Sequence, residues 1–255
     1  MLSPPLRPGP RRRRRRPTVG PLLLAVVLGA CSTNGTSATG STTTTSTSAS
    51  AADLALAQRE LLPASAFPTG WKGQGSGSTN SDASFFGGAS AGQIAQLLRC
   101  LGVSSTDVDP HPSEAGDQEY DDPDSNVTVT DTVDVFPTVA QATKDVESAA
   151  NPKTPACVVQ VERSQLEKAT PAGAVLGTLR ARRASLPSDG EHHAAVVVYF
   201  PFRYEGVSTT LYLEAVIVEV GRSESDLEFL DTGGPPPSSV VDRLAGAAAR
   251  QLVAA

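Results

Sequence analysis

The first 50 residues of this chain contribute little to a folded core, which confines the fold to the residues that follow. Six consecutive arginines, residues 11–16, precede a 10-residue apolar stretch, residues 21–30. A helix of that length covers about 15 Å, half of the hydrocarbon core of a bilayer, so it is too short for a comfortable membrane span. Residues 32–50 are almost entirely Ser, Thr, Gly and Ala, which bury too little apolar surface to offset their ordering entropy.

A basic run followed by a short apolar stretch is typical of a cleaved secretory signal peptide. The quartet Leu28-Gly29-Ala30-Cys31 resembles the lipobox of bacterial lipoproteins, in which the cysteine is acylated and begins the mature chain. We therefore predict a lipoprotein signal peptide over residues 1–30, lipidation of Cys31, and a flexible Ser/Thr-rich tether over residues 31–51. The expected location is the extracytoplasmic face of the cell membrane. A buried core helix and a basic nucleic-acid-binding segment are the alternatives, and the export route and glycosylation of the tether stay open.

Removal of the signal peptide changes the charge of the protein. The full chain has 21 basic and 27 acidic residues, and seven arginines but no acidic residue lie within residues 1–30. The mature chain therefore has 14 basic and 27 acidic residues, a net charge of about −13. A chain this acidic lacks the basic surface that nucleic acids require, and it is repelled by anionic lipid. We expect no nucleic-acid partner, and attachment to the membrane through the lipid alone.

Residues 52–255 are long enough for one domain with a hydrophobic core. They contain two cysteines, Cys100 and Cys157. An even pair in an exported domain favours a disulfide, with a catalytic thiol as the alternative. Neither cysteine has a second Cys or His at ligand spacing, so we predict no metal site there.

The pattern of the remaining residues predicts an α+β fold, an antiparallel sheet packed by helices. In residues 126–136, Val127, Val129, Val133 and Val135 alternate with polar residues, which predicts a strand, and Asp131 interrupts its apolar side. Further strands are predicted over residues 194–200 and 211–220, separated by residues 202–210, and over residues 175–183. Helices are predicted over residues 54–62, over residues 90–101 with Ser90 as the cap, and over residues 138–150 with Thr138 as the cap. After a break at Pro152 and Pro155, a further helix is predicted over residues 157–168. The last predicted helix begins at a cap at Ser238 or Ser239 and runs into the C-terminal region.

Several short motifs resemble a recurrent pattern of actinobacterial lipoproteins and, more distantly, the extracellular sensor domain of PknH-type serine/threonine kinases. They are Leu61-Leu62-Pro63, Phe67-Pro68-Thr69-Gly70-Trp71, Leu98-Arg99-Cys100-Leu101-Gly102, and Val135-Phe136-Pro137 followed by Ala140, Ala142 and Cys157. This resemblance implies an antiparallel α+β domain over residues 61–255 with a possible ligand cleft and no catalytic role. The chain differs from the sensor domain in having one available cysteine pair instead of two disulfides, and in having no kinase or transmembrane segment.

Three motifs could indicate chemistry. Gly88-Ala89-Ser90-Ala91-Gly92 matches the G-x-S-x-G nucleophile elbow, but no buried strand precedes Ser90, so a helix cap is the favoured interpretation. Residues 114–124 form an acidic run whose end matches only the first ligands of a calcium loop, so we predict a solvated acidic loop. The sequence Glu191-His192-His193 lacks a third metal ligand in pattern, and is predicted to lie in a loop leading into a hairpin.

These observations favour a non-enzymatic, lipid-anchored envelope protein that binds a ligand or a partner protein and needs no cofactor. The candidate ligand-binding residues are aromatic: Trp71, Phe85, Phe86 and Tyr212. Ordinary core packing is the alternative for each of them. An envelope serine hydrolase that uses Ser90 or a histidine is the second function class, and a passive structural lipoprotein is the third. The identity of the ligand and the oligomeric state do not follow from the sequence.

Overall fold

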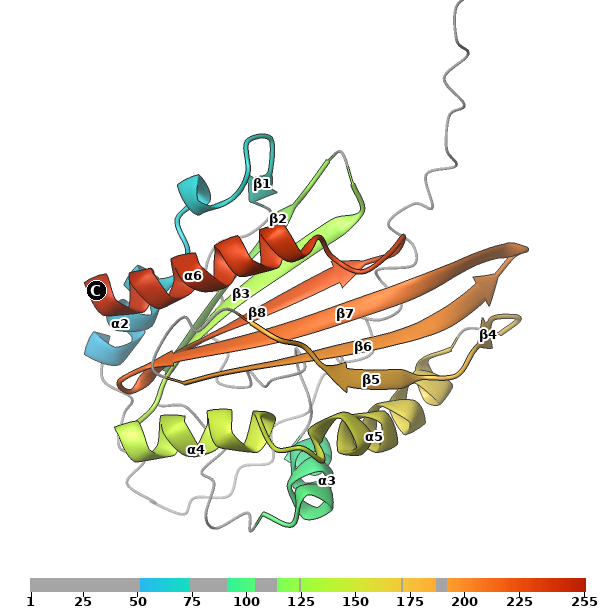
Figure 1. Cartoon of the computed structure of the whole chain (residues 1–255), viewed down its shortest axis with the longest axis horizontal. Helices are drawn as coiled ribbons and strands as arrows, with labels where there is room; N and C mark the ends of the chain where they lie inside the picture. The colour runs from blue at the N-terminus through green and yellow to red at the C-terminus, as the bar shows by residue number, and fades with distance from the viewer. Residues whose placement is uncertain (1–50, 74–90, 104–113, 124, 171, 187–191) are drawn as a thin grey trace, which may run out of the picture. The chain divides into compact units, whose positions relative to one another are not determined.

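The computed structural model describes residues 51–73, 91–103, 114–123, 125–170, 172–186 and 192–255. Its centre is an eight-stranded sheet with the order β1-β2-β3-β8-β7-β6-β4, and β5 pairs with β6 as well (Figure 1). Every strand pair is antiparallel, and helices pack on both faces of the sheet, so the predicted α+β fold is confirmed. The strands are β1 (Lys72–Gly73), β2 (Glu114–Asp121), β3 (Val127–Val135), β4 (Val175–Leu176), β5 (Arg180–Arg183), β6 (His192–Tyr204), β7 (Val207–Val220) and β8 (Ser223–Asp231).

One face of the sheet packs against α2 (Ala51–Glu60) and α6 (Ser238–Ala254), and we call it the α6 face. The alternating valines of β3 lie on this face, and all four are buried. They share it with Leu227 and Phe229 of β8 and with Leu244 of α6. The period-two pattern that predicted β3 therefore reflects its one apolar side.

The opposite face packs against α3 (Ala91–Leu101), α4 (Val139–Ala149) and α5 (Thr154–Ala169), and we call it the α5 face. Its apolar part joins Val196, Val198 and Phe200 of β6 to Val158 of α5. Val146 of α4 packs nearby against Ile217 of β7. Two apolar layers therefore enclose the central strands, one on each side.

The longest strands, β6 and β7, form a hairpin with a two-residue turn. The turn residues Glu205 and Gly206 both have positive φ values, 50° and 80°, as a type I′ turn requires. The sequence had placed the connection over residues 202–210, and this was too wide. Most of that segment continues the strands, because the turn itself needs only two residues.

Other sequence-based boundaries also need correction. The acidic run that was predicted as a loop is largely strand β2, and strand β8 was not predicted. Helix α5 begins at Thr154, before the predicted start, because proline is tolerated in the first turn of a helix, where Pro155 lies. The segment predicted as one strand over residues 175–183 is divided into β4 and β5. Helix α6 has Pro237 at its N-cap position with no side-chain cap, so neither serine caps it.

Candidate functional site

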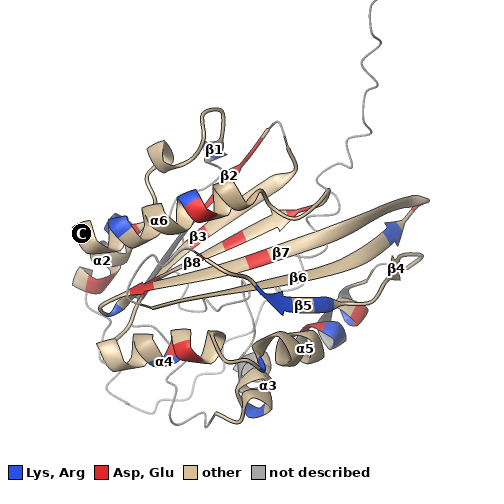
Figure 2. Ribbon diagram, viewed as in Figure 1, with Lys and Arg blue, Asp and Glu red and all other residues tan. Residues whose placement is uncertain are grey.

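Carboxylates gather on the α5 face where β3, β8 and β7 run side by side. Glu224 of β8 lies directly opposite both Asp134 of β3 and Glu219 of β7. Asp226 lies two residues further along β8 and therefore projects from the same face. Asp145 of α4 adds a fifth carboxylate, which is hydrogen-bonded to Glu224. We call these five residues the acidic cluster; its strands and α4 carry acidic residues in Figure 2.

The four strand residues of the acidic cluster are buried and sparsely hydrogen-bonded, and Asp145 is half-buried. The strand residues are at most 7% exposed. Thr143 Oγ1 of α4 donates a hydrogen bond of 2.9 Å to Glu219 Oε1. Within the described part of the chain, Asp134, Glu224 and Asp226 each have one buried oxygen without a hydrogen-bond partner. Because an unpaired buried charge is costly, these groups favour the protonated form.

The pKa values in the cluster are displaced accordingly. Burial raises the pKa of Asp145 to about 6, against the opposing effect of its hydrogen bond with Glu224. Burial first, and neighbouring carboxylates second, raise the pKa of Asp134, Glu224 and Asp226 well above the usual range. Among the described residues, no three His, Cys, Asp or Glu residues converge so that they could hold a metal ion. The chemistry that this arrangement supports is proton uptake.

Asp131, the residue that interrupts the apolar side of β3, lies with the valines on the α6 face and is fully buried. Its carboxylate accepts hydrogen bonds from the Leu62 backbone N–H at 2.7 Å, Gln118 Nε2 at 3.1 Å and Ser225 Oγ at 3.0 Å. Burial raises the pKa of Asp131 to about 6 in spite of these three donors. Asp131 therefore joins the segment after α2 to β2, β3 and β8.

A cavity of about 340 Å³ lies on the α5 face, between α5 and the residues that connect β4 to β5. Its apolar lining comes from Leu166 of α5, Leu176 and Leu179 around the connection, and Phe200 of β6. Leu179 and Phe200 are buried, whereas Arg163 and Glu167 of α5 are exposed and also line the cavity. The cavity thus has a mixed lining, in which leucine and phenylalanine side chains lie beside polar and charged groups.

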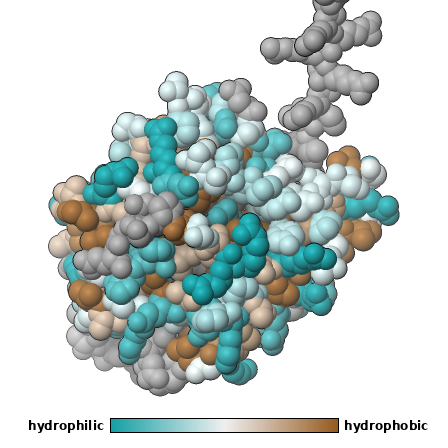
Figure 3. All heavy atoms as spheres, viewed as in Figure 1, coloured by the Kyte–Doolittle hydropathy of each residue, from teal (hydrophilic) through white to brown (hydrophobic). Residues whose placement is uncertain are grey.

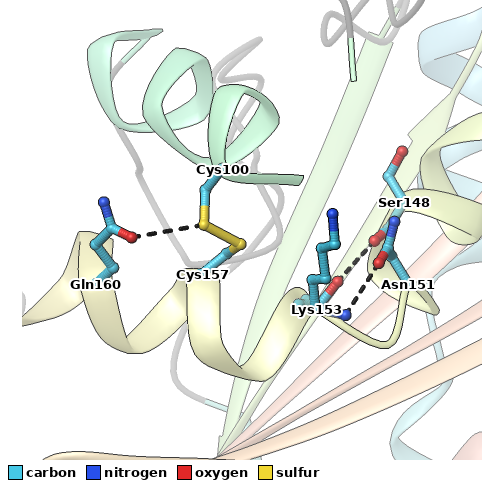
Figure 4. The surroundings of a disulfide bond; sticks show 7 residues. Cys100, Ser148, Asn151, Lys153, Cys157 and Gln160 are labelled. Atoms are coloured by element: carbon cyan, nitrogen blue, oxygen red, sulfur yellow. Dashed lines mark hydrogen bonds between the residues drawn. A yellow bond between two sulfur atoms is a disulfide. The ribbon is translucent and has the colours of Figure 1, made fainter. Parts of the chain in front are cut away.

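Helix α5, whose C-terminal half lines this cavity, carries Cys157 of the disulfide with Cys100, which the sequence predicted and the structure contains. The disulfide joins α3 to α5 with a Cα–Cα distance of 5.6 Å (Figure 4). Gln160 lies one turn further along α5 and places Oε1 3.6 Å from Cys100 Sγ. At the start of α5, the Lys153 backbone N–H donates to Asn151 Oδ1 at 2.9 Å. The position of α5 is therefore set at its N-terminal half.

Of the four candidate aromatic residues, Trp71 and Tyr212 lie in the described part of the chain. Trp71 is half-buried against Phe67, with 5.7 Å between ring centroids, and belongs to the core of the α6 face. Tyr212 is half-buried on β7 and stacks on Tyr199 of β6. The two do not form one site, and neither lines the cavity. The contact of Trp71 with the core agrees with the alternative of ordinary core packing, and its role in ligand binding stays a prediction.

Other predicted site residues lie outside the described residues: Cys31, Phe85, Phe86 and Ser90. His192 and His193 begin strand β6, so they lie in the hairpin itself and not in a loop before it. Among the helices that the structure describes, none combines the length and the apolar character needed to cross a membrane.

No protein-family model and no curated protein matches the chain. Among solved structures, it is similar to the extracellular domain of PknH from Mycobacterium tuberculosis, with a TM-score of 0.40 and 12% sequence identity. The alignment covers 77% of this chain and 94% of that domain. A likeness at this level establishes neither membership of a family nor a function.

The sequence did not predict the acidic cluster or the cavity. Both depend on which strands become neighbours, a property that no local pattern contains. A signal for the cluster does exist in the alternation of Glu224, Asp226 and Glu228 along β8, since residues two apart in a strand share a face.

Proposed function

We propose that this protein is a non-enzymatic, lipid-anchored component of the cell envelope that binds a small, partly apolar ligand on the extracytoplasmic side. The cavity between α5 and the β4–β5 connection is the observation that carries the binding function. Its volume of about 340 Å³ lies within the range of small-molecule sites, roughly 300–1,000 Å³. Anchoring and location rest on the signal-peptide layout and on Cys31.

The lining of the cavity defines the class of ligand. Leu176, Leu179 and Phe200 offer apolar surface, which favours a hydrocarbon or aromatic group by removing it from water. The guanidinium of Arg163 can pair with a carboxylate or a phosphate at the rim. An amphipathic molecule with one anionic end fits this arrangement.

The cavity is also held in shape, which lowers the cost of ordering it around a ligand. The Gly177 backbone N–H donates to the Pro201 carbonyl at 2.7 Å, so the β4–β5 connection is attached to β6. A Cβ at position 177 would lie 2.9 Å from the Pro201 side chain, so only glycine allows this approach. The disulfide holds α5, the opposite wall.

The non-enzymatic part of the proposal rests on the sequence. The chain has three histidines, and Ser90 follows a Gly/Ser-rich stretch instead of the buried strand that a nucleophile elbow requires. A hydrolase remains the competing function class, and a labelling experiment that separates the two is given in the Discussion.

The test uses anilinonaphthalene sulfonate, a fluorescent probe with an apolar ring system and one anionic group. We expect saturable binding to the native protein, weakened about tenfold or more by Thr178→Trp, which fills the cavity, and also weakened by Arg163→Ala. Ser239→Trp, at an exposed site on α6, is the matched control and should bind the probe as the wild type does. Near-UV circular dichroism verifies that each variant is folded. Equal binding by all four proteins would refute the cavity as the ligand site.

A further inference from the structure

The described helices do not cover the whole width of the α6 face. Helix α6 packs on β7 and β8, around Val216 and Leu227, and no described helix lies over the part of this face next to β5 (Figure 1). The strand register places four side chains there in one cross-strand row: Arg180 of β5, Tyr199 of β6, Tyr212 of β7 and Asp231 of β8. We call this set the tyrosine row. It lies on the other side of the sheet from the α5 cavity.

The centre of the tyrosine row is an aromatic platform. The rings of Tyr199 and Tyr212 stack with 5.7 Å between centroids and 16° between planes, and both side chains are partly exposed. Neither hydroxyl forms a hydrogen bond with another described residue. A partly exposed tyrosine offers a ligand the flat apolar surface of its ring and a hydroxyl that can form a hydrogen bond.

One end of the row is strongly basic. Arg180, Arg182 and Arg183 are exposed on the edge strand β5, which is almost entirely basic in Figure 2, and hydrophilic residues gather over this region in Figure 3. Arg180 and Arg182 project from the same face as the tyrosines because of the alternation of the strand. Arg180 forms no ion pair with a described acidic residue.

Charged residues on an edge strand also prevent the pairing of sheets between molecules, and this role alone would explain arginines on β5. It does not explain why two partly exposed tyrosines lie in register with them. Two cationic side chains beside an aromatic platform, Arg180 and Arg182, on a chain with 27 acidic residues, form a local site for anions.

The acidic neighbours of the row limit the charge density of the partner. Asp231 ends the row, and Glu214 lies beside Tyr212 on β7, near Arg182 and near Asp242 of α6. A densely charged polymer such as a nucleic acid would meet these carboxylates. A lipid surface is also a poor fit, because the exposed large apolar side chains of the described residues, Val139, Val175, Val207 and Val253, lie outside the row.

We propose that the tyrosine row binds an acidic polysaccharide, with sugar rings stacked on Tyr199 and Tyr212 and a carboxylate or phosphate of the chain paired with Arg180 and Arg182. An extended polymer suits a flat surface that crosses four strands, about 14 Å at the usual strand spacing. Because each anionic group of such a chain is carried on a sugar ring, the rings can lie on the uncharged centre of the row while an anionic group reaches its basic end. This binding is independent of the cavity.

The test measures binding of the purified full-length protein to polygalacturonic acid by calorimetry at low and moderate salt. Dextran serves as the neutral polymer and polyaspartate as the polyanion without sugar rings. We expect binding to polygalacturonic acid that is at least about tenfold tighter than binding to either of the other polymers. Absence of binding, or equal affinity for polyaspartate, overturns the proposal.

Variants locate the site. Arg180→Ser with Arg182→Ser should weaken polygalacturonic acid binding about tenfold or more, since charge-assisted pairs are lost. Tyr199→Leu with Tyr212→Leu, which keeps apolar packing, should weaken it about three- to tenfold through the loss of aromatic stacking.

The control variant, Arg243→Ser with Arg250→Ser, removes two exposed arginines from α6 and should bind as the wild type does. An equal loss in the control, or no loss in the tyrosine variant, overturns the assignment. Each variant should also retain the binding of anilinonaphthalene sulfonate, which shows that it is folded and separates this site from the cavity.

Discussion

The backbone N–H of Leu62 donates a hydrogen bond of 2.7 Å to Asp131 Oδ2, although the two residues are 69 positions apart. Leu62 itself is 1% exposed, and Gln118 contacts both partners, donating to the Leu62 carbonyl and to the same Asp131 oxygen. A single carboxylate therefore positions the segment that follows α2 on the sheet. This relationship yields the first prediction.

Asp131→Ala should lower the free energy of unfolding by about 2–4 kcal/mol, because three donors lose their acceptor inside the core. Urea unfolding monitored by circular dichroism measures the change. Asp121→Ala is the control, since this half-exposed carboxylate accepts a bond from Thr128 Oγ1 at the end of β2, and it should cost about 1 kcal/mol or less. Equal losses in the two variants would contradict the role assigned to Asp131.

The stability of the protein should fall as the pH rises from 5 to 7.5. The pKa values of Asp131 and Asp145 are about 6 in the folded protein, above the ordinary aspartate value of 3.8 that applies to the unfolded chain. A raised folded-state pKa contributes stability that is complete below the unfolded value and is lost as the pH rises through the folded value. Thermal unfolding midpoints across this pH range measure the effect, and a rising midpoint would contradict it.

A variant tests the share of this pH dependence that comes from the acidic cluster, to which Asp131 does not belong. Asp226→Asn should raise the free energy of unfolding at pH 7.5 by on the order of 1–2 kcal/mol and flatten the pH profile, since it removes a buried acidic group beside Glu224 and Asp134. Glu147→Gln, on the exposed side of α4, is the matched control and should leave the profile unchanged. The same change in both variants would place the effect outside the cluster.

Removal of the disulfide should destabilise the protein and loosen the cavity. Cys100→Ala with Cys157→Ala should lower the free energy of unfolding by roughly 4 kcal/mol in the chain-entropy model, because the crosslink spans 57 residues. Binding of anilinonaphthalene sulfonate should also weaken, since α5 is no longer tied to α3. Reduction of the wild-type disulfide, with the free thiols verified by mass spectrometry, is the companion experiment. An unchanged unfolding midpoint in the reduced protein or in the double variant would contradict this prediction.

Cys31→Ser should release the protein from the membrane, because the variant lacks the acylated side chain. Partition between detergent and aqueous phases, together with the mass of the mature N-terminus, measures the change. Ser32→Ala leaves the cysteine intact and should partition as the wild type does. Equal retention of Cys31→Ser and wild type in the detergent phase would rule out the lipid anchor.

The full-length protein should not react with a fluorophosphonate probe, in accordance with the proposed binding function. Labelling is measured by mass spectrometry of tryptic peptides, with Ser90→Ala as the comparison. Labelling at Ser90 that this substitution abolishes while the fold is retained would establish the competing hydrolase function.

The sequence predicted those parts of the fold in which apolar residues recur at the spacing of a helix or a strand. Strand β3 and helix α3 each present one apolar side, and the helix α4 cap follows from Thr138, whose side chain accepts the Gln141 backbone N–H. The disulfide followed from the count of cysteines in a segment that we predict to be exported. Local propensity and the local environment agree at these positions.

The parts that the sequence did not predict bury acidic residues. Strand β8 alternates Glu224, Asp226 and Glu228 with Ser225 and Leu227, so neither side resembles a half-buried apolar strand. Strand β2 was assigned to a solvated loop because its sequence is rich in acidic residues. The tyrosine row could not be predicted from the sequence, because Arg180, Tyr199 and Tyr212 become neighbours only through strand register.

The order of strands in the sheet has a consequence for how the chain assembles. Strand β8 follows β7 in the sequence, yet it pairs on its other side with β3, which was made about ninety residues earlier. Until β8 is available, β3 and β7 each have an open edge, and the sheet consists of two halves with no shared hydrogen bonds among the described strands. A chain that emerges from its N-terminus therefore cannot complete its core before Asp231 has emerged. Truncation before Ser223 should yield protein that aggregates through these edges instead of a smaller stable domain.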